Sequence, residues 1–102
     1  MDSKRGLNLC VSEGTMTLQA ELLSPPGNYA VVQLPRRNYP GVVVQGDSLH
    51  MLKQQAQRMG RLLAAMALEE LADEIEYLTE QLSEVQRHYE RVCAERHIAL
   101  PY

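Results

Sequence analysis

The sequence predicts an α+β protein in which a small three-stranded antiparallel meander precedes a two-helix antiparallel hairpin. Three observations predict this fold class. Residues 16–45 carry short β-type runs that Pro and Gly separate. From Leu49 onward, apolar residues recur at spacings of three and four, which is the helical period. The 102 residues include neither Phe nor Trp, and a core of Leu, Ala, Val and Met suits helix packing better than a β-sandwich.

The chain length predicts one domain with a single modest core. We expect residues 16–102 to form this domain. Residues 1–15 are polar and contain glycines, apart from a short alternating run at 7–11. They are therefore expected to be a flexible or edge-strand extension.

Strands are expected at about residues 16–23, 29–34 and 41–45. The first run alternates apolar and polar side chains, which is typical of a strand with one solvated face. The connection at 24–28 has the sequence Ser-Pro-Pro-Gly-Asn, whose Pro and Gly favour a turn. The second connection, 35–40, begins and ends with Pro. The three strands are therefore expected to pair as a meander.

Helices are expected at about residues 48–66 and 68–97, because two apolar series follow the helical period. The first series is Leu49, Leu52, Ala56, Met59, Leu63 and Met66, and the second is Leu68, Leu71, Ile75, Leu78, Leu82, Val85, Tyr89 and Val92. A slip of two residues separates them, which at ~100° per residue would carry the apolar side to roughly the opposite face of one helix. We therefore expect a break near 66–68. One long continuous helix is the alternative, because Ala64–Ala67 contains no turn residue.

Charges also divide between the two helical segments. Residues 49–66 carry three bases and no acid, whereas residues 69–84 carry only acids. These residues are Lys53, Arg58 and Arg61, followed by Glu69, Glu70, Asp73, Glu74, Glu76, Glu80 and Glu84. Opposite charges favour antiparallel pairing of neighbouring helices. The second apolar series is too long for one short helix and three strands to cover, so we expect oligomeric helical packing of identical chains.

Composition narrows the class of protein. The net charge of -3 argues against a nucleic-acid-binding surface spread over the whole protein, so nucleic acid is not an expected partner. No long apolar run follows Met1–Arg5 or occurs elsewhere, so neither a secretory signal nor a membrane span is expected, and a cytoplasmic location is predicted. Cys10 and Cys93 lie far apart without a C-x-x-C pairing, which favours free thiols over a disulfide.

The strongest candidate for ligand binding is the connection that contains Arg36, Arg37 and Tyr39. Two guanidinium groups can chelate a phosphate or carboxylate, and a tyrosine ring can stack on a base. Ser48, at the start of the first helix, is a further candidate because helix N-termini attract anions. Asp47 opposes an anion there, and the Asp47-Ser48 pair also has a simpler interpretation as the helix N-cap.

Side chains that could hold a metal occur on the second helix. Glu70 and Asp73 have i, i+3 spacing, but the facing helix offers no carboxylate to complete a magnesium site. Cys93 and His97 have i, i+4 spacing, but with His88 they still lack a fourth zinc ligand. We therefore predict no metal, no cofactor and no catalytic residue, with a metal-dependent hydrolase as the remaining enzymatic alternative.

Two segments together resemble a known family. They are the string Tyr39-Pro40-Gly41-Val42-Val43-Val44-Gln45-Gly46-Asp47-Ser48-Leu49 and the ending Ile98-Ala99-Leu100-Pro101-Tyr102. The chain resembles, over roughly residues 16–102, a family of small uncharacterised bacterial and phage proteins. That family carries no assigned activity, so the resemblance implies no catalytic or binding residues.

These observations predict a non-catalytic, homo-oligomeric binding protein that takes, and could sequester, a small anionic ligand such as a signalling nucleotide. The alternative is a protein–protein interaction module of the immunity or inhibitor type. It would use the acidic helix face 69–84, with Glu69, Glu70 and Asp73 as the partner-binding residues.

Overall fold

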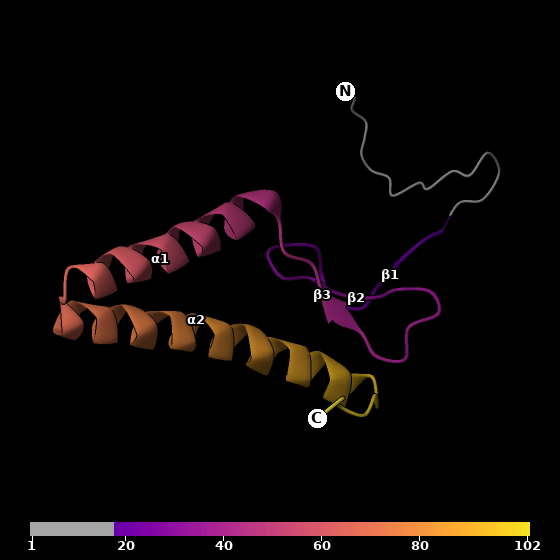
Figure 1. Ribbon diagram of the computed structural model, residues 1–102. Coiled ribbons are helices and arrows are strands. Elements are labelled where there is room, and N and C mark those ends of the chain that lie inside the picture. Colours follow the sequence, from indigo (N-terminus) through magenta and orange to yellow (C-terminus); the bar gives the residue numbers. More distant parts are fainter. Residues whose placement is uncertain (1–17) are drawn as a thin grey trace, which may run out of the picture.

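Three short strands come first along the chain and two long helices follow (Figure 1). The elements are β1 (Glu21–Leu22), β2 (Val31–Gln33), β3 (Gly41–Val42), α1 (Gly46–Ala64) and α2 (Leu68–Glu95). This computed structural model describes residues 18–102, so the expected extension at 1–15 and Cys10 lie outside the described residues. The predicted α+β fold, with a meander before a helical hairpin, is confirmed.

The strands form an antiparallel sheet in the order β1-β2-β3. Each strand is shorter than predicted, because regular pairing is confined to a few residues on either side of the two Pro-containing connections. Pairing continues one residue past the strands: the N–H of Leu23 donates to the carbonyl of Val31 (2.9 Å), and the N–H of Val43 donates to that of Ala30 (2.8 Å). The buried hydroxyl of Ser24 accepts a hydrogen bond from the N–H of Val31 (2.8 Å).

Helix α1 begins two residues earlier than predicted. The first helical hydrogen bond joins the N–H of Leu49 to the carbonyl of Gln45 (2.8 Å), and Gln45 makes no side-chain cap. The expected N-cap at Asp47 or Ser48 was therefore wrong. Asp47 lies inside the first turn, where its Oδ1 accepts a hydrogen bond from the N–H of Ser48 (2.8 Å). Its negative charge interacts favourably with the positive N-terminal end of the helix dipole.

The turn between the helices is made without glycine. Met66 adopts a left-handed conformation, with φ of 58°. The N–H of Ala67 donates to the carbonyl of Leu62 (2.9 Å), and that of Met66 to Leu63 (3.0 Å), which is the Schellman pattern. The chain therefore reverses near residues 66–68 as predicted, and the alternative of one continuous helix was wrong.

Helix α2 ends in the same way. His97 has φ of 58°, and the N–H of Ile98 donates to the carbonyl of Cys93 (2.8 Å). The chain then folds back, and the hydroxyl of the final Tyr102 donates to a carboxylate oxygen of Glu90 (2.7 Å). The C-terminal segment is thus held against the last turns of α2.

Polar side chains make several of the contacts between the two helices. Nε2 of Gln55 donates to Oε1 of Gln81 (2.7 Å), and Nε of Arg58 lies 3.1 Å from a carboxylate oxygen of Glu74. Apolar residues between the helices, such as Leu52, are only half-buried, and α1 has no fully buried residue. The hairpin is therefore a thin two-helix layer without a core of its own.

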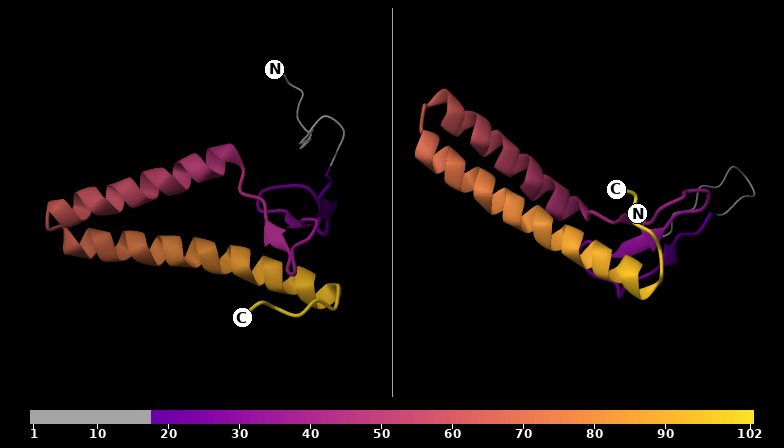
Figure 2. Two further views of the ribbon diagram at one scale, coloured as in Figure 1. Left: turned by 45° about the vertical axis from the view of Figure 1, so that its right-hand side comes forward. Right: turned by 90° about the horizontal axis from the view of Figure 1, so that it is seen from below.

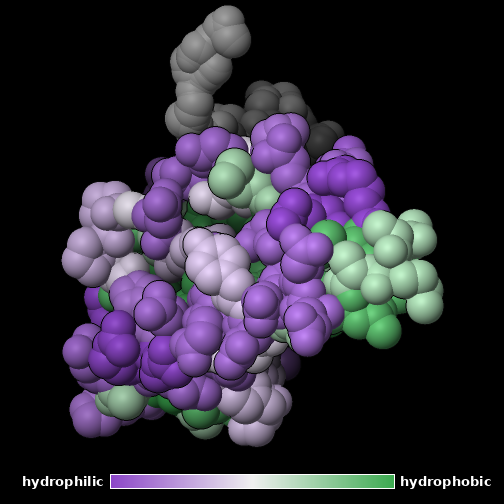
Figure 3. All heavy atoms as spheres, turned by 90° about the vertical axis from the view of Figure 1, so that its left-hand side faces the viewer, coloured by the Kyte–Doolittle hydropathy of each residue, from purple (hydrophilic) through white to green (hydrophobic). Residues whose placement is uncertain are grey.

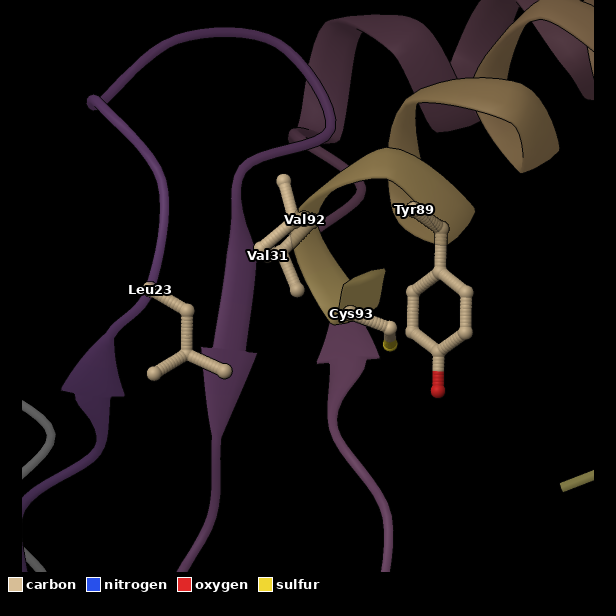
Figure 4. Packing of buried hydrophobic residues seen from close by; sticks show 5 residues of the cluster. All are labelled: Leu23, Val31, Tyr89, Val92 and Cys93. Carbon is tan, nitrogen blue, oxygen red and sulfur yellow. The ribbon is translucent and has the colours of Figure 1, made fainter. Parts of the chain in front are cut away.

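The core lies where the sheet meets the last turns of α2, at the open end of the hairpin (Figure 2). Side chains from the sheet and from α2 converge there, as Figure 4 shows for Leu23, Val31, Tyr89, Val92 and Cys93. Val31 is fully buried and Cys93 is a buried free thiol. The sheet is therefore held against α2, and this packing fixes the direction in which the β1–β2 and β2–β3 connections project.

Candidate functional site

The connection between β2 and β3 forms an open hollow of about 410 Å³. Five consecutive residues line it: Arg36, Arg37, Asn38, Tyr39 and Pro40. The loop extends from the sheet on the side opposite the turn of the hairpin (Figure 1). Three of the four predicted ligand-binding residues therefore lie around one hollow.

The loop is held in shape by a side chain that the sequence did not single out. Nε2 of Gln33, the last residue of β2, donates to the carbonyls of Leu34 (3.1 Å) and Arg37 (2.8 Å). Within the loop, Arg36 has φ of 66°, a left-handed conformation that is uncommon for a residue with a side chain. These two hydrogen bonds offset part of that strain. They also fix the backbone from which the two arginine side chains extend.

The far end of the loop is tied to α2. The hydroxyl of Tyr89 donates to the carbonyl of the buried Pro40 (2.9 Å). Burial, together with the neighbouring Cys93, raises the pKa of Tyr89 above its ordinary value, so the phenol keeps its proton. Nothing in the sequence marks Tyr89 for this role beyond its place in the apolar series.

The functional groups around the hollow are exposed. Arg36, Arg37 and Tyr39 all reach solvent, and Tyr39 is 47% exposed. Among residues 18–102, no carboxylate forms an ion pair with either arginine. Two guanidinium groups and a phenol on a pinned loop can bind a phosphate or carboxylate by charge-assisted hydrogen bonds.

Ser48 does not join this hollow. It lies in the first turn of α1, half-buried, and is absent from the lining of the loop. Strand β3 and the segment after it separate the two places along the chain, and the loop lies across the sheet from the start of α1 (Figure 1). One chain alone does not bring Ser48 to the arginines.

The acidic residues lie at the opposite end of the molecule, at the turn of the hairpin (Figure 1). Glu69 and Glu70 line an open hollow of about 380 Å³ with the apolar Met66 and Leu68. Asp73 is exposed one turn further along α2. Two predicted partner-binding residues thus share a surface with exposed apolar side chains.

A third hollow, of about 330 Å³, was missed by the sequence interpretation because three separate segments build it. The β1–β2 turn contributes Tyr29, α1 contributes Leu52, and α2 contributes residues that include Gln81 and His88. Tyr29 has φ of 59°, which is strained for a bulky residue. No sequence signal joins such distant positions.

The described residues also bear on metal binding and on membrane insertion. Within residues 18–102, no three His, Cys, Asp or Glu side chains gather as a metal site requires. In the same part of the chain, neither helix combines the length and the apolar character that crossing a membrane needs.

Comparisons with known proteins place the chain in a family but give it no activity. No curated protein matches it, and no solved structure does. Residues 16–102, which contain the whole of the described sheet and hairpin, match a family of unknown function. The expected resemblance to an uncharacterised family is therefore confirmed, and the chain belongs to the family of unknown function DUF6959.

Proposed function

We propose that this protein is a non-catalytic binding protein that holds a small anionic ligand at the Arg36–Pro40 loop. One observation carries the proposal: the two adjacent arginines and a tyrosine line the same hollow of about 410 Å³. The volume falls within the range of small-molecule sites, which is roughly 300 to 1,000 Å³. Arg36 and Arg37 would bind phosphate oxygens, and the ring of Tyr39 would stack on a base. A signalling nucleotide has this chemistry, and tight binding would sequester it.

The pinned loop supports this assignment energetically. Binding to a mobile loop costs conformational entropy, roughly 0.5–1.5 kcal/mol for each side chain that becomes ordered. Gln33 and Tyr89 already hold the backbone on both sides of the arginines. The ligand would then have to order only the exposed side chains.

Isothermal titration calorimetry against a panel of mono-, di- and cyclic nucleotides tests the proposal. The double variant Arg36→Ala/Arg37→Ala should weaken binding by at least about 100-fold, which corresponds to two charge-assisted contacts. The matched control is Lys53→Ala/Arg61→Ala, which removes the same charge from α1. The control should leave binding within about twofold. Absence of heat with every nucleotide, or equal losses in both variants, would overturn the proposal.

Tyr39 has a separate test. Tyr39→Leu keeps an apolar group but removes the aromatic face, so affinity for a nucleotide should fall by about five- to tenfold while affinity for inorganic phosphate stays unchanged. Tyr77→Leu, at an exposed tyrosine of α2, is the control. A parallel loss for nucleotide and phosphate would contradict base stacking.

A second candidate function is a protein-interaction module that uses the acidic end of the hairpin. The observation that favours it is the hollow where Glu69 and Glu70 adjoin exposed Met66 and Leu68, since interfaces combine apolar contact with a charged rim. A basic protein partner would be captured by the wild type and lost with Glu69→Gln/Glu70→Gln/Asp73→Asn. Retention with this triple variant would reject the acidic face as the binding surface.

A further inference from the structure

The hairpin carries two rows of exposed apolar side chains, one on each helix. The rows are Leu49, Ala56 and Leu63 on α1, and Leu68, Ile75 and Leu82 on α2. The five large side chains in these rows are between 48% and 59% exposed. Members of each row are seven residues apart, which is the heptad spacing of helices that pack along their length.

The two rows lie on the same side of the hairpin. The half-buried residues of α1 that face α2 include Leu52, Gln55 and Met59. At ~100° per residue, the centre of the α1 row lies about 80° around the helix axis from these inward-facing residues. The α2 row lies at about the same angle from the residues of α2 that face α1. Both rows are rotated in the same sense about their own helix axis. Because the two helices are antiparallel, both rows therefore point to the same side of the hairpin. Figure 3, which looks from the side of the hairpin turn, shows hydrophobic spheres gathered mainly at one edge of a mostly hydrophilic surface.

The rows also match in level. Leu63 and Leu68 are equally distant from the turn along the chain to within one residue, as are Ala56 and Ile75, and as are Leu49 and Leu82. Each pair therefore forms one layer across the antiparallel hairpin. Three such layers make a face that is nearly symmetric between its two helices. We call these six residues the hairpin face.

The α2 row continues into the core. The next member after Leu82 at heptad spacing is Tyr89, which is 8% exposed because the sheet covers it. Leu82 is 50% exposed. Among residues 18–102 the sheet covers this side only near the C-terminal end of α2 (Figure 2). The hairpin face is the same apolar side continued away from the sheet, and Leu82, which lines a hollow with Gly41 and Val42 of β3, is its member nearest the sheet.

We propose that a second copy of this chain covers the hairpin face, so that the two hairpins pack as a four-helix bundle. In such a bundle the apolar side of each helix points between its two neighbours rather than straight at one of them. The inward half-buried residues face one neighbour, and the rows, about 80° further round, would face the other, so the apolar side of each helix as a whole points between the two. A hairpin that was complete alone would point its apolar side at its own partner helix.

Size and charge favour a second copy as the occupant. With 19 residues in α1, the face is about 28 Å long and about 20 Å wide, or on the order of 600 Å² per copy. Two copies would bury roughly 1,200 Å², the lower bound for specific interfaces. The bases of α1 and the acids at the start of α2 give one hairpin both signs of charge. A two-fold copy that sets α1 beside α2 of the other chain would bring opposite signs together.

Two variants on α2 test the proposal. Ile75 and Tyr77 are both exposed, at 48% and 59%, but Tyr77 lies about 200° further round the helix and off the face. Ile75→Glu should weaken dimerisation by at least about 100-fold, because two carboxylates would be buried per dimer. Tyr77→Glu, with the same added charge, should dimerise like the wild type. Light scattering on size-exclusion chromatography and sedimentation equilibrium measure the mass.

The wild-type chain is expected at twice its 11.5 kDa mass, with dissociation on dilution. Circular dichroism should show a helical Ile75→Glu monomer, since Ile75 contributes to no core within one chain. A wild type that stays monomeric at about 100 μM, a concentration at which micromolar dimers are formed, would overturn the proposal. So would equal dissociation of both variants, or an Ile75→Glu dimer of unchanged affinity. The nucleotide titration reports on a different surface, so either proposal can fail alone.

Discussion

The two ends of α2 carry the same apolar period and have opposite surroundings. Near the C-terminal end, Tyr89 and Val92 are 8% and 5% exposed beneath the sheet. Near the start, Leu68 and Ile75 are 54% and 48% exposed. A helical period therefore indicates on which side of a helix an apolar partner is expected. It does not say which partner, or whether that partner belongs to the same chain.

The polar contacts of the two regions differ in the same way. At the sheet end, the Ser24 hydroxyl and the Tyr89 hydroxyl make buried hydrogen bonds, and a guanidinium nitrogen of Arg96 donates to the carbonyl of Leu23 (3.1 Å). In the hairpin, Arg58 and Glu74 form an ion pair whose arginine side is half exposed. Buried bonds are costly to break, whereas exposed pairs exchange with water. The sheet end should therefore dominate the stability of one chain.

The largest loss of stability is expected for Val92→Asp, which places a charge in the core at the sheet end. A carboxylate placed among Val31 and Leu23 loses its hydration and gains no partner, so the cost should exceed about 4 kcal/mol. A cost of this size is a large part of a typical domain's stability of about 5–15 kcal/mol. Tyr77→Asp on the exposed side of α2 should change stability by less than about 0.5 kcal/mol. Urea denaturation followed by circular dichroism measures both; similar midpoints would contradict the contrast.

Tyr89→Phe tests the hydrogen bond that joins the sheet end to the ligand loop. It keeps the ring but leaves the buried carbonyl of Pro40 without its donor, which should cost about 1–2 kcal/mol. Tyr77→Phe serves as the control, because its hydroxyl is exposed. If the loop is pinned through Pro40, Tyr89→Phe should also speed hydrogen exchange in residues 36–40. Unchanged exchange there would separate Tyr89 from the loop.

The raised pKa of Tyr89 predicts that the stability of the protein depends on pH. The folded-state pKa of this residue is raised above the ordinary tyrosine value of 10.0, chiefly by burial. The unfolded chain therefore loses this proton at a lower pH than the folded chain. Stability should be constant below pH 10 and fall as the pH rises through and above it. The fall should be smaller in Tyr89→Phe, and an identical alkaline decline in both proteins would show that other groups cause it.

Met66→Gly, at the turn of the hairpin, is expected to raise the stability of the protein. Met66 has φ of 58° and is 72% exposed, so it contributes little packing and carries the cost of a left-handed conformation. Glycine adopts that conformation freely, and stability should rise by about 0.5–1 kcal/mol. Ala65→Gly, one residue earlier at φ of -86°, should lower stability by a similar amount. Thermal melts of both variants give the comparison; equal signs would contradict it.

The smallest effect is expected for the ion pair between Arg58 and Glu74. A double-mutant cycle with Arg58→Ala and Glu74→Ala should give a coupling of about 0.2–1 kcal/mol, because the arginine is half exposed. The coupling should shrink in 1 M salt, where the screening length is about 3 Å. A larger, salt-independent coupling would show that the hairpin is buried by something beyond the described chain.

The candidate site was predictable in part. Arg36, Arg37 and Tyr39 share one short connection, so their nearness follows from sequence alone, and the structure places them around one hollow. Ser48 was grouped with them only by chemical type, and the fold separates it from the loop. Gln33 and Tyr89 were missed, since their roles depend on which backbone carbonyls come within reach. A contact 49 residues apart along the chain leaves no local pattern.

The order of elements and the break between the helices follow from the amino-acid sequence, because side-chain periods of two and 3.6 and the two-residue slip are local properties. The form of the turn, and the part of each apolar side that is buried, depend on contacts between distant parts of the chain. Met66 and His97 adopt left-handed caps that no glycine announced, since the hydrogen bonds that support them involve whole helix ends. Burial depends on what else lies nearby in space: the sheet covers Tyr89 and leaves Leu68 exposed.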